Sequence, residues 1–438
     1  MKPVLRIPAF RRLLAAYALN ELAFMVGTVA LTLLVYRRTG SAIGATAFFL
    51  CSQFVPALVS PALVARLDQL PLRPVLPALY WVEAVIFVGL AALAGRHFGL
   101  ASVLALSFLN GVLALIARSL ARAATVAVTS AADLLREGNA VVNGAFSVCF
   151  MVGPGIGGTI VATGGTSPAL LAVAGLFILI GLTLVTARGL PEPAPIRGPV
   201  RGRLRAALDY ARERPSIRGL LLLQASAVLF FTISVPVEVV FAQHSLHAGA
   251  AGYGAMLSAW GAGAVAGAAV YARWRSRPNR ELISLGAGAL GVGFIVMAAA
   301  PTLAVAIVGG AIAGVGNGIE SVASRTAIQE ETEGQWMALI MSLQESIYQS
   351  VPGAGMLLGG TITALGSPRT ALAVAGAGSL AITGLVWVAL GRLTPAAAGG
   401  AIAPTGSGPS AGAPPTQPDP GRGPHRHDST RTPAVRHQ

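Results

Sequence analysis

Charged side chains are scarce in this sequence. Only 11% of its 438 residues are Asp, Glu, Lys or Arg, whereas 54% are apolar. A soluble chain of this length would form two or three domains with polar surfaces, and this composition does not supply them. The charges lie in short segments between long apolar runs, as expected when the runs cross a hydrocarbon core. The composition therefore predicts an all-α polytopic membrane protein.

Cysteine and enzyme motifs are also scarce. Cys51 and Cys149 are the two cysteines of the chain, and both lie inside apolar runs without metal-ligand spacing, so we expect no disulfide and no metal site. The sequence has no G-x-x-x-x-G-K-[ST] phosphate loop, which argues against ATP hydrolysis. It also lacks H-E-x-x-H, and the sequence before the tail 392–438 lacks G-x-S-x-G. His244 and His247 have no third ligand nearby in the sequence. We expect no cofactor, and a polytopic membrane enzyme is a remote alternative.

Basic residues give the chain a formal net charge of +14. The arginines are distributed among many inter-helix segments and form no stripe with interleaved aromatic residues, so the positive-inside rule explains them better than nucleic-acid binding. The apolar run from Leu13 to Val35 is too long for a signal-peptide core, and we expect it to be a retained first span.

Apolar runs of about 18–25 residues mark transmembrane helices. The sequence contains twelve, at 13–35, 43–64, 75–95, 99–123, 139–163, 167–187, 219–242, 251–272, 282–300, 302–324, 337–364 and 369–391. With the N-terminus in the cytoplasm, the outside segments hold only Arg37, Arg38, Arg96 and Arg369. This asymmetry predicts an even number of spans with both termini cytoplasmic. Our hypothesis places the chain in a bacterial inner membrane. Arg37 and Arg38 are its one poor fit.

Four parts follow from these spans. Residues 1–187 and 217–391 are two six-helix bundles. Residues 188–216 form a cytoplasmic linker that opens with the proline-rich LPEPAP and continues as a basic, helix-like segment. The tail 392–438 is rich in Gly, Pro, Ala and Thr, and we expect it to be disordered in the cytoplasm.

The stretch GPGIGG at 153–158 has the spacing G-x-G-x-x-G of a dinucleotide-binding turn, but no acidic residue follows before Glu192, far beyond the required distance. An internal repeat explains it better, because GGTIVATG at 157–164 returns as GGTITALG at 359–366. The repeated parts run in the same direction, which predicts two parallel six-helix repeats. We expect the following residues to serve helix packing: Gly153, Pro154, Gly155, Gly157, Gly158, Pro352, Gly353, Gly359 and Gly360.

Twelve spans in two parallel halves resemble the major facilitator superfamily, almost to residue 391. FRRLLAAYALNEL at 10–22, VYRRTGSA at 35–42, LREGNAVVNGAF at 135–146 followed by GPGIGG, and RERPSIRGLLLLQ at 212–224 are similar to its macrolide-efflux and enterobactin-exporter branch. The resemblance implies a monomeric transporter whose spans one, four, seven and ten line a central cavity. VARLDQLPLRPVL at 64–76 resembles the superfamily's loop at the cytoplasmic gate, where Asp68 and Arg73 match, while Val64 replaces a glycine and Gln69 a basic residue.

Ionisable side chains inside hydrocarbon are candidates for function because each costs several kcal/mol. Glu21 lies eight residues into span one, near the bilayer centre, and the resemblance places it at the cavity. It is the first candidate for the coupling proton, although a structural glutamate between helices is an equal alternative. Glu83 and Glu345 are weaker candidates, in the peripheral span three and in span eleven. Glu238 lies toward the outer end of span seven, where water can solvate it.

Other polar residues on the cavity-lining spans complete the hypothesis. Asn20, Phe24, Asn110, Gln224 and Asn317 are candidates for contact with substrate, or for packing and hydrogen bonds between helices. Arg118 and Arg122, four residues apart on one helical face, and Arg325 in the related place of span ten are gate candidates, or arginines that snorkel to the interface. The resulting hypothesis is a proton-coupled exporter of bulky small molecules, with protons, substrate and lipid as its partners. An importer or uniporter of a small metabolite is the alternative.

Overall fold

The structure is a computed structural model that describes residues 3–59, 72–95, 98–186, 208–333 and 336–391. Within these ranges the chain is helical and contains no strand. Asp68, most of the linker 188–216 and the whole tail 392–438 lie outside the described residues, so the predictions for them stay predictions. Residues Met1–Thr394 group together as one unit.

The N-terminal half holds six long helical segments after a short turn, η1 (Val4–Arg6). They are α1 (Pro8–Thr39), α2 (Ala42–Phe49) with its continuation through the π-helical turn η2 (Leu50–Phe54), α4 (Leu72–Gly95), α5 (Leu100–Ala131), α6 (Leu135–Gly164) and α7 (Thr166–Val185). Local signals set several ends. Pro8 occupies the first turn of α1, where its missing N–H is no loss, and Gly40 ends that helix in the left-handed conformation at φ 60°.

The C-terminal half repeats this plan. Its helices are α9 (Pro215–Val240) followed by the π-helical turn η3 (Phe241–Ser245), α10 (Gly249–Trp274), α11 (Asn279–Ala299), α12 (Leu303–Glu331), α13 (Met337–Leu365) and α14 (Pro368–Gly391). Eleven helices of the described chain are long and apolar enough to cross a membrane. The twelfth long helix, α13, has 29 residues, and polar residues such as Gln344, Glu345 and Gln349 interrupt its apolar run.

Helix packing shows the repeat directly. Five pairs of packed helices in the N-terminal half have a counterpart in the C-terminal half. They are α4–α7 with α11–α14, α1–α7 with α9–α14, α1–α6 with α9–α13, α4–α5 with α11–α12, and α2–α5 with α10–α12. The register agrees as well, because Gly157 of α6 packs on Val26 of α1, and Gly359 of α13 packs on Ile233 of α9. The two halves are therefore parallel repeats, as predicted.

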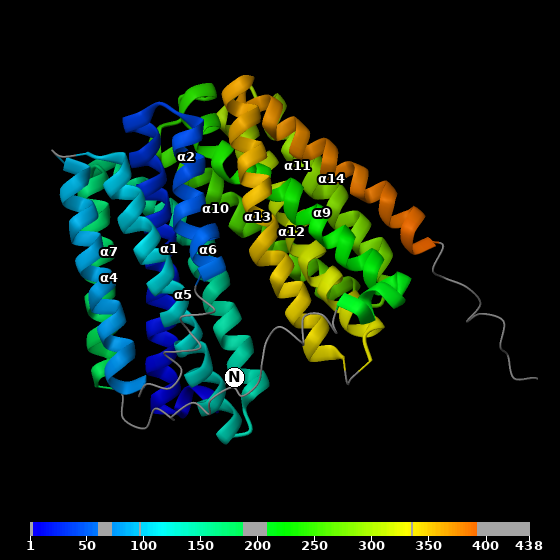
Figure 1. Ribbon diagram of the computed structural model, residues 1–438, viewed down its shortest axis with the longest axis horizontal. Coiled ribbons are helices and arrows are strands. Elements are labelled where there is room, and N and C mark those ends of the chain that lie inside the picture. The colour runs from blue at the N-terminus through cyan, green and yellow to red at the C-terminus, as the bar shows by residue number, and fades with distance from the viewer. Residues whose placement is uncertain (1–2, 60–71, 96–97, 187–207, 334–335, 392–438) are drawn as a thin grey trace, which may run out of the picture. The chain divides into compact units, whose positions relative to one another are not determined.

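The two ends of the bundle differ in charge. The end that carries the N-terminus (Figure 1), here called the basic face, holds most of the arginines of the described residues. At the other end, the opposite face, the described arginines are Arg37, Arg38 and Arg369. Arg38 donates to the carbonyls of Ala94 and Gly95, the last residues of α4, each at 3.0 Å. Arg369 donates to Ala298 near the end of α11 at 2.8 Å.

These two arginines thus cap repeat-equivalent helices. A guanidinium at a helix C-terminus satisfies free carbonyls and complements the helix dipole. Arg38 fits the charge asymmetry poorly. The structure gives a physical reason for its position, because its guanidinium is held by the carbonyls at the end of α4.

The halves meet in the part of the bundle next to the opposite face. Helix α6 meets α10, where the Gly155 amide donates to Ser258 Oγ at 2.9 Å and a Cβ on Gly158 would lie 2.5 Å from the Ala250 carbonyl. By the repeat, α2 meets α13, with Gly353 against the Phe54 ring. Glycines here allow backbones to approach closely. The structure is therefore closed at the opposite face.

Toward the basic face, one side of α13 is polar and open. Its residues recur every three or four positions, which places them on one helical face. Ser342, Glu345, Ser346 and Ser350 are exposed, and Gln349 is half-buried. A polar stripe of this kind on a membrane helix borders water rather than lipid. We infer that water reaches the interior of the bundle from the basic face.

Candidate functional site

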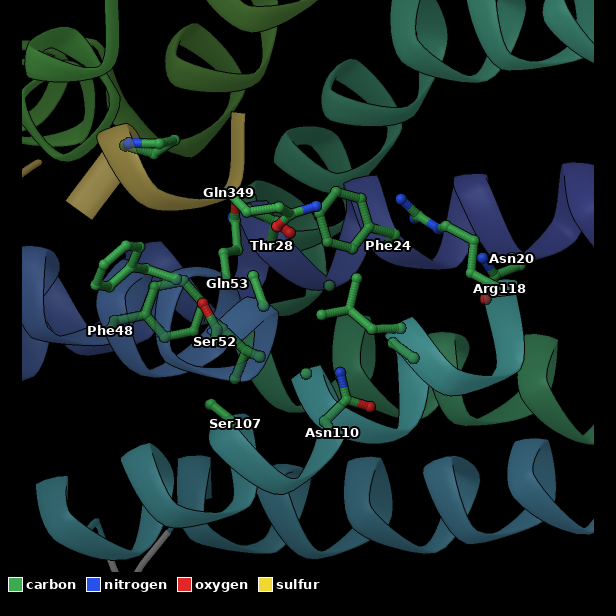
Figure 2. A pocket seen from close by; sticks show the side chains of 18 of the residues that line it. Asn20, Phe24, Thr28, Phe48, Ser52, Gln53, Ser107, Asn110, Arg118 and Gln349 are labelled. Carbon is green, nitrogen blue, oxygen red and sulfur yellow. The ribbon is translucent and has the colours of Figure 1, made fainter. Parts of the chain in front are cut away.

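A cavity of about 230 Å³ lies among α1, α2 with η2, α4, α5, α7 and α13. Figure 2 shows the polar and aromatic side chains around it. Its lining brings together the predicted residues Asn20, Phe24, Asn110 and Arg118, which lie almost 100 residues apart in the sequence. Phenylalanines form much of the remaining wall: Phe48, Phe54, Phe87 and Phe177.

An ion pair lies at one wall of the cavity, with Arg118 in the lining and Glu21 behind it. Arg118 Nη2 of α5 lies 3.1 Å from Glu21 Oε1 of α1, and the Arg118 guanidinium lies over the Phe24 ring, 5.3 Å from its centroid. The Glu21 side chain is 1% exposed, whereas that of Arg118 is 36% exposed. The acid is thus shielded behind the arginine, and Arg118 is the charge that the cavity presents. Arg118 was predicted as a gate residue. The structure places it in the cavity lining, and its gate role stays a prediction.

Several polar atoms around the cavity are buried without a partner among the described residues. They include Ser52 Oγ, Ser107 Oγ, Asn110 Oδ1 and Arg118 Nε. Glu21 Oε2, behind Arg118, is also buried without a hydrogen-bond partner. Leaving such a group unpaired costs about 1–3 kcal/mol. Water or a bound molecule that offered complementary groups would remove this cost. The cavity is therefore suited to an amphipathic ligand that fills an aromatic space and satisfies a few polar groups.

Helix α13 contributes the C-terminal half's part of the cavity lining. Tyr348, Gln349, Pro352 and Met356 lie on the wall, and Figure 2 shows Gln349 reaching in from this helix. Glu345, one turn earlier, is exposed and accepts a hydrogen bond from Gln349 Nε2 at 3.0 Å. Glu345 was a candidate for the coupling proton, and its described contact orients a cavity residue.

Glu83 of α4 lies behind the cavity. Its side chain is 0% exposed, and neither carboxylate oxygen has a hydrogen-bond partner among the described residues. Tyr80 and Phe87, one turn away on either side, pack on the Phe177 ring. The cavity lining does not include Glu83.

Two predicted cavity residues lie elsewhere. Gln224 of α9 is buried and accepts a hydrogen bond from Gln344 Nε2 of α13 at 3.0 Å. This is the packing alternative for Gln224, and it ties two helices of the C-terminal half together. Asn317 of α12 is half-buried, and the cavity lining does not include it.

The remaining gate candidates lie toward the basic face. Arg122 on α5 and Arg325 on α12 occupy equivalent places in the two repeats, and both are exposed. Arg73 is exposed in the first turn of α4. The described residues show no salt bridge to any of the three. In this conformation they have the placement expected of interfacial arginines. Their role in a gate stays a prediction.

The predicted packing residues lie at helix contacts. A Cβ on Gly153 would meet Met25 at 2.6 Å, and one on Gly155 would meet Ser258 Oγ at 3.0 Å. Gly360 packs against Thr46 of α2 across the halves. Pro154 and Pro352 lie inside α6 and α13, and Pro352 also lines the cavity.

Sequence reasoning missed part of the lining. Thr28, Ser52, Gln53 and Ser107 face the cavity, although the sequence marks them only as small or neutral polar residues within apolar spans. Their one available signal was helical spacing, since Asn20, Phe24 and Thr28 follow one another at four-residue intervals on α1. Span two was assigned no cavity role, yet α2 and η2 supply Phe48, Ser52 and Gln53.

Two packing-equivalent halves, with a polar and aromatic cavity in the first half that α13 of the second half completes, define a membrane transporter of the major facilitator fold. The chain belongs to the transmembrane secretion effector family of that superfamily, whose sequence model matches residues 3–399. No curated protein matches the chain.

Solved structures agree on the fold. The nucleoside transporter NupG is 14% identical with a TM-score of 0.65, and the match covers 88% of this chain and 99% of that one. A POT family transporter in complex with a thioalcohol-conjugated peptide is 12% identical with a TM-score of 0.67, covering 88% and 96%. A bacterial homologue of the iron transporter ferroportin in an inward-facing state is 12% identical with a TM-score of 0.66, covering 87% and 98%.

Proposed function

We propose that this transporter is a proton-coupled exporter of bulky, largely apolar small molecules, such as drugs, macrolides or siderophore-like compounds. It would work as a monomer in a bacterial inner membrane, with the basic face in the cytoplasm. The observation that carries the proposal is the Glu21–Arg118 pair on the cavity wall. A secondary transporter needs a protonatable group whose charge the cargo can sense, and this pair is such a group.

The charge of the pair provides the coupling. With Glu21 ionised, the two side chains are together neutral, and the cavity accepts a neutral or cationic amphipathic cargo against its phenylalanines. When Glu21 takes a proton, Arg118 leaves one uncompensated positive charge at the cavity. Two like charges roughly 5 Å apart at an effective dielectric constant near 20 repel by about 3 kcal/mol. Proton and cationic cargo therefore exclude one another, which is the requirement of an antiporter.

Alternating access follows from the same geometry. The halves are closed at the opposite face and water reaches α13 from the basic face, so cargo would enter from the cytoplasm. Rocking of the repeats would then open the cavity outward, where a proton would reach Glu21 and release the cargo. The return step would carry the proton inward.

The cavity also bears on cargo size. Its volume of about 230 Å³ is below the range of about 300–1,000 Å³ that encloses drug-sized ligands. A bulky cargo would place its apolar end among Phe24, Phe48 and Phe54 and extend its remainder toward the basic face. A small metabolite would fit entirely, which is the size that an importer or uniporter would handle.

The test is transport by the purified protein in proteoliposomes under an imposed pH gradient, with a lipophilic cationic dye as probe. We expect dye to move against the proton flux, and we expect Glu21→Gln to reduce this to background at normal protein incorporation. Glu331→Gln is the matched control, because Glu331 is exposed at the end of α12. Flux that ignores the pH gradient would support a uniporter, and undiminished pumping by Glu21→Gln would remove Glu21 from the mechanism.

A further inference from the structure

A second acidic residue lies at the opposite face, where the halves meet. Glu238, close to the end of α9, was expected to be solvated, but its side chain is only 9% exposed. Ser234 Oγ, one turn earlier, donates to Glu238 Oε1 at 3.0 Å. The described residues hold no salt bridge to Glu238. A carboxylate ion at such a place is costly, whereas the neutral acid is tolerated.

The surroundings of Glu238 belong to the closed gate. Tyr253 of α10 is 1% exposed, and Thr32 of α1, in the other half, is 0% exposed. Helix α9, which carries Glu238, packs on α1 and α2 of that other half. Burial of this corner thus depends on α9 remaining in contact with α1 and α2.

The end of α9 is also irregular. Pro236 interrupts its hydrogen-bond ladder between Ser234 and Glu238, and the helix continues into the π-helical turn η3. Kinks at proline and π-helical turns recur at moving and functional sites. Other charged or titratable side chains that the structure describes at the opposite face include those of Tyr36, Arg37, Arg38, His244, His247 and Arg369. Arg38 and Arg369 are both engaged with helix-end carbonyls.

We propose that Glu238 is a proton-binding site that latches the gate at the opposite face. With the gate closed, Glu238 carries a proton and stays buried where α9 packs on the other half. Separation of α9 from α1 and α2 admits water, and the acid can release its proton to the outer solution. Reclosure requires a proton from that solution to bind the carboxylate again. The latch rests on the proposed function, because it adds an external proton step to the return of an exporter.

The experiment measures the gate itself, without cargo. Spin labels are placed on Thr163→Cys of α6 and Ala251→Cys of α10, both exposed near the opposite face, in a Cys51→Ser, Cys149→Ala background. Electron–electron distances are then recorded in nanodiscs across pH. We expect the long-distance, open population to grow as pH rises.

In Glu238→Gln, which keeps an acceptor for Ser234, we expect the short distance to persist and the pH dependence to disappear. Glu320→Gln is the matched control, because Glu320 of α12 is also 9% exposed and accepts from a serine one turn away, Ser324 Oγ at 2.7 Å. It should keep the normal pH profile.

A second variant guards against misfolding of the first. Ser234→Ala removes the hydroxyl that favours the ionised carboxylate, so we expect the opening midpoint to rise by about one pH unit. An unchanged pH profile in both Glu238→Gln and Ser234→Ala would overturn the latch. If the pH profile of the gate is unchanged but transport is still driven by protons, the latch is wrong and the proposed function stands. If transport is independent of the proton gradient, the proposed function is wrong, and the gate measurement still tests the latch.

Discussion

Removal of Arg118 should destabilise the protein more than removal of its ion-pair partner Glu21. Arg118→Met leaves a carboxylate that is 1% exposed and whose Oε2 already lacks a partner. Breaking a buried pair in this way costs about 3–5 kcal/mol. Glu21→Gln leaves an arginine that is 36% exposed and in contact with the Phe24 ring, so the cost should be nearer about 1–2 kcal/mol.

The pH dependence adds a sign to this prediction. In Arg118→Met, the folded protein can relieve the unpaired charge by taking a proton at Glu21, so it binds more protons than the unfolded chain. Its stability must then rise as pH falls, by at most about 1.4 kcal/mol per pH unit. The defect of Arg118→Met should be larger at pH 8 than at pH 5. Glu21→Gln cannot titrate at this position and should show a nearly constant defect.

Thermal unfolding of the purified protein in detergent at both pH values measures these differences. The double variant Glu21→Gln/Arg118→Met should recover much of the loss of Arg118→Met, since no unpaired charge remains. Arg122→Met is the control, because Arg122 lies one turn along α5 and is exposed, and a change within about 0.5 kcal/mol is expected. Equal defects for Glu21→Gln and Arg118→Met at both pH values would refute the reasoning.

Two further predictions concern the bundle. Gly158→Val should favour opening at the opposite face, because its Cβ would lie 2.5 Å from the Ala250 carbonyl. The distance between the spin labels on α6 and α10 measures this opening. Gly175→Ala is the control, since no atom lies within 4 Å of its added Cβ. Identical label distances in Gly158→Val and Gly175→Ala would contradict the prediction. Arg38→Ala and Arg369→Ala should each lower stability by about 1–2 kcal/mol through loss of a helix cap, without changing topology in a reporter-fusion assay. An inverted topology would show that these arginines act as charge signals instead.

The sequence was sufficient for the architecture because hydrocarbon imposes a simple rule. Every backbone group must be paired internally, so long apolar runs become helices. The repeat of GGTIVATG as GGTITALG then showed two parallel halves, since glycines recur where helices must approach closely. The helices exceed the predicted spans at several ends, because α1, α5 and α12 continue beyond their apolar runs.

The site needed the tertiary structure. Glu21 and Arg118 were both singled out by the cost of charge in a membrane, but as a proton carrier and a gate residue, and only the packing of α1 on α5 brings them together. The same holds for Gln224, which pairs with Gln344, and for Glu238, whose side chain is only 9% exposed. Hydropathy measures how apolar a segment is along the chain. It cannot show which side of a helix meets lipid, protein or water, and that choice is made when the helices pack.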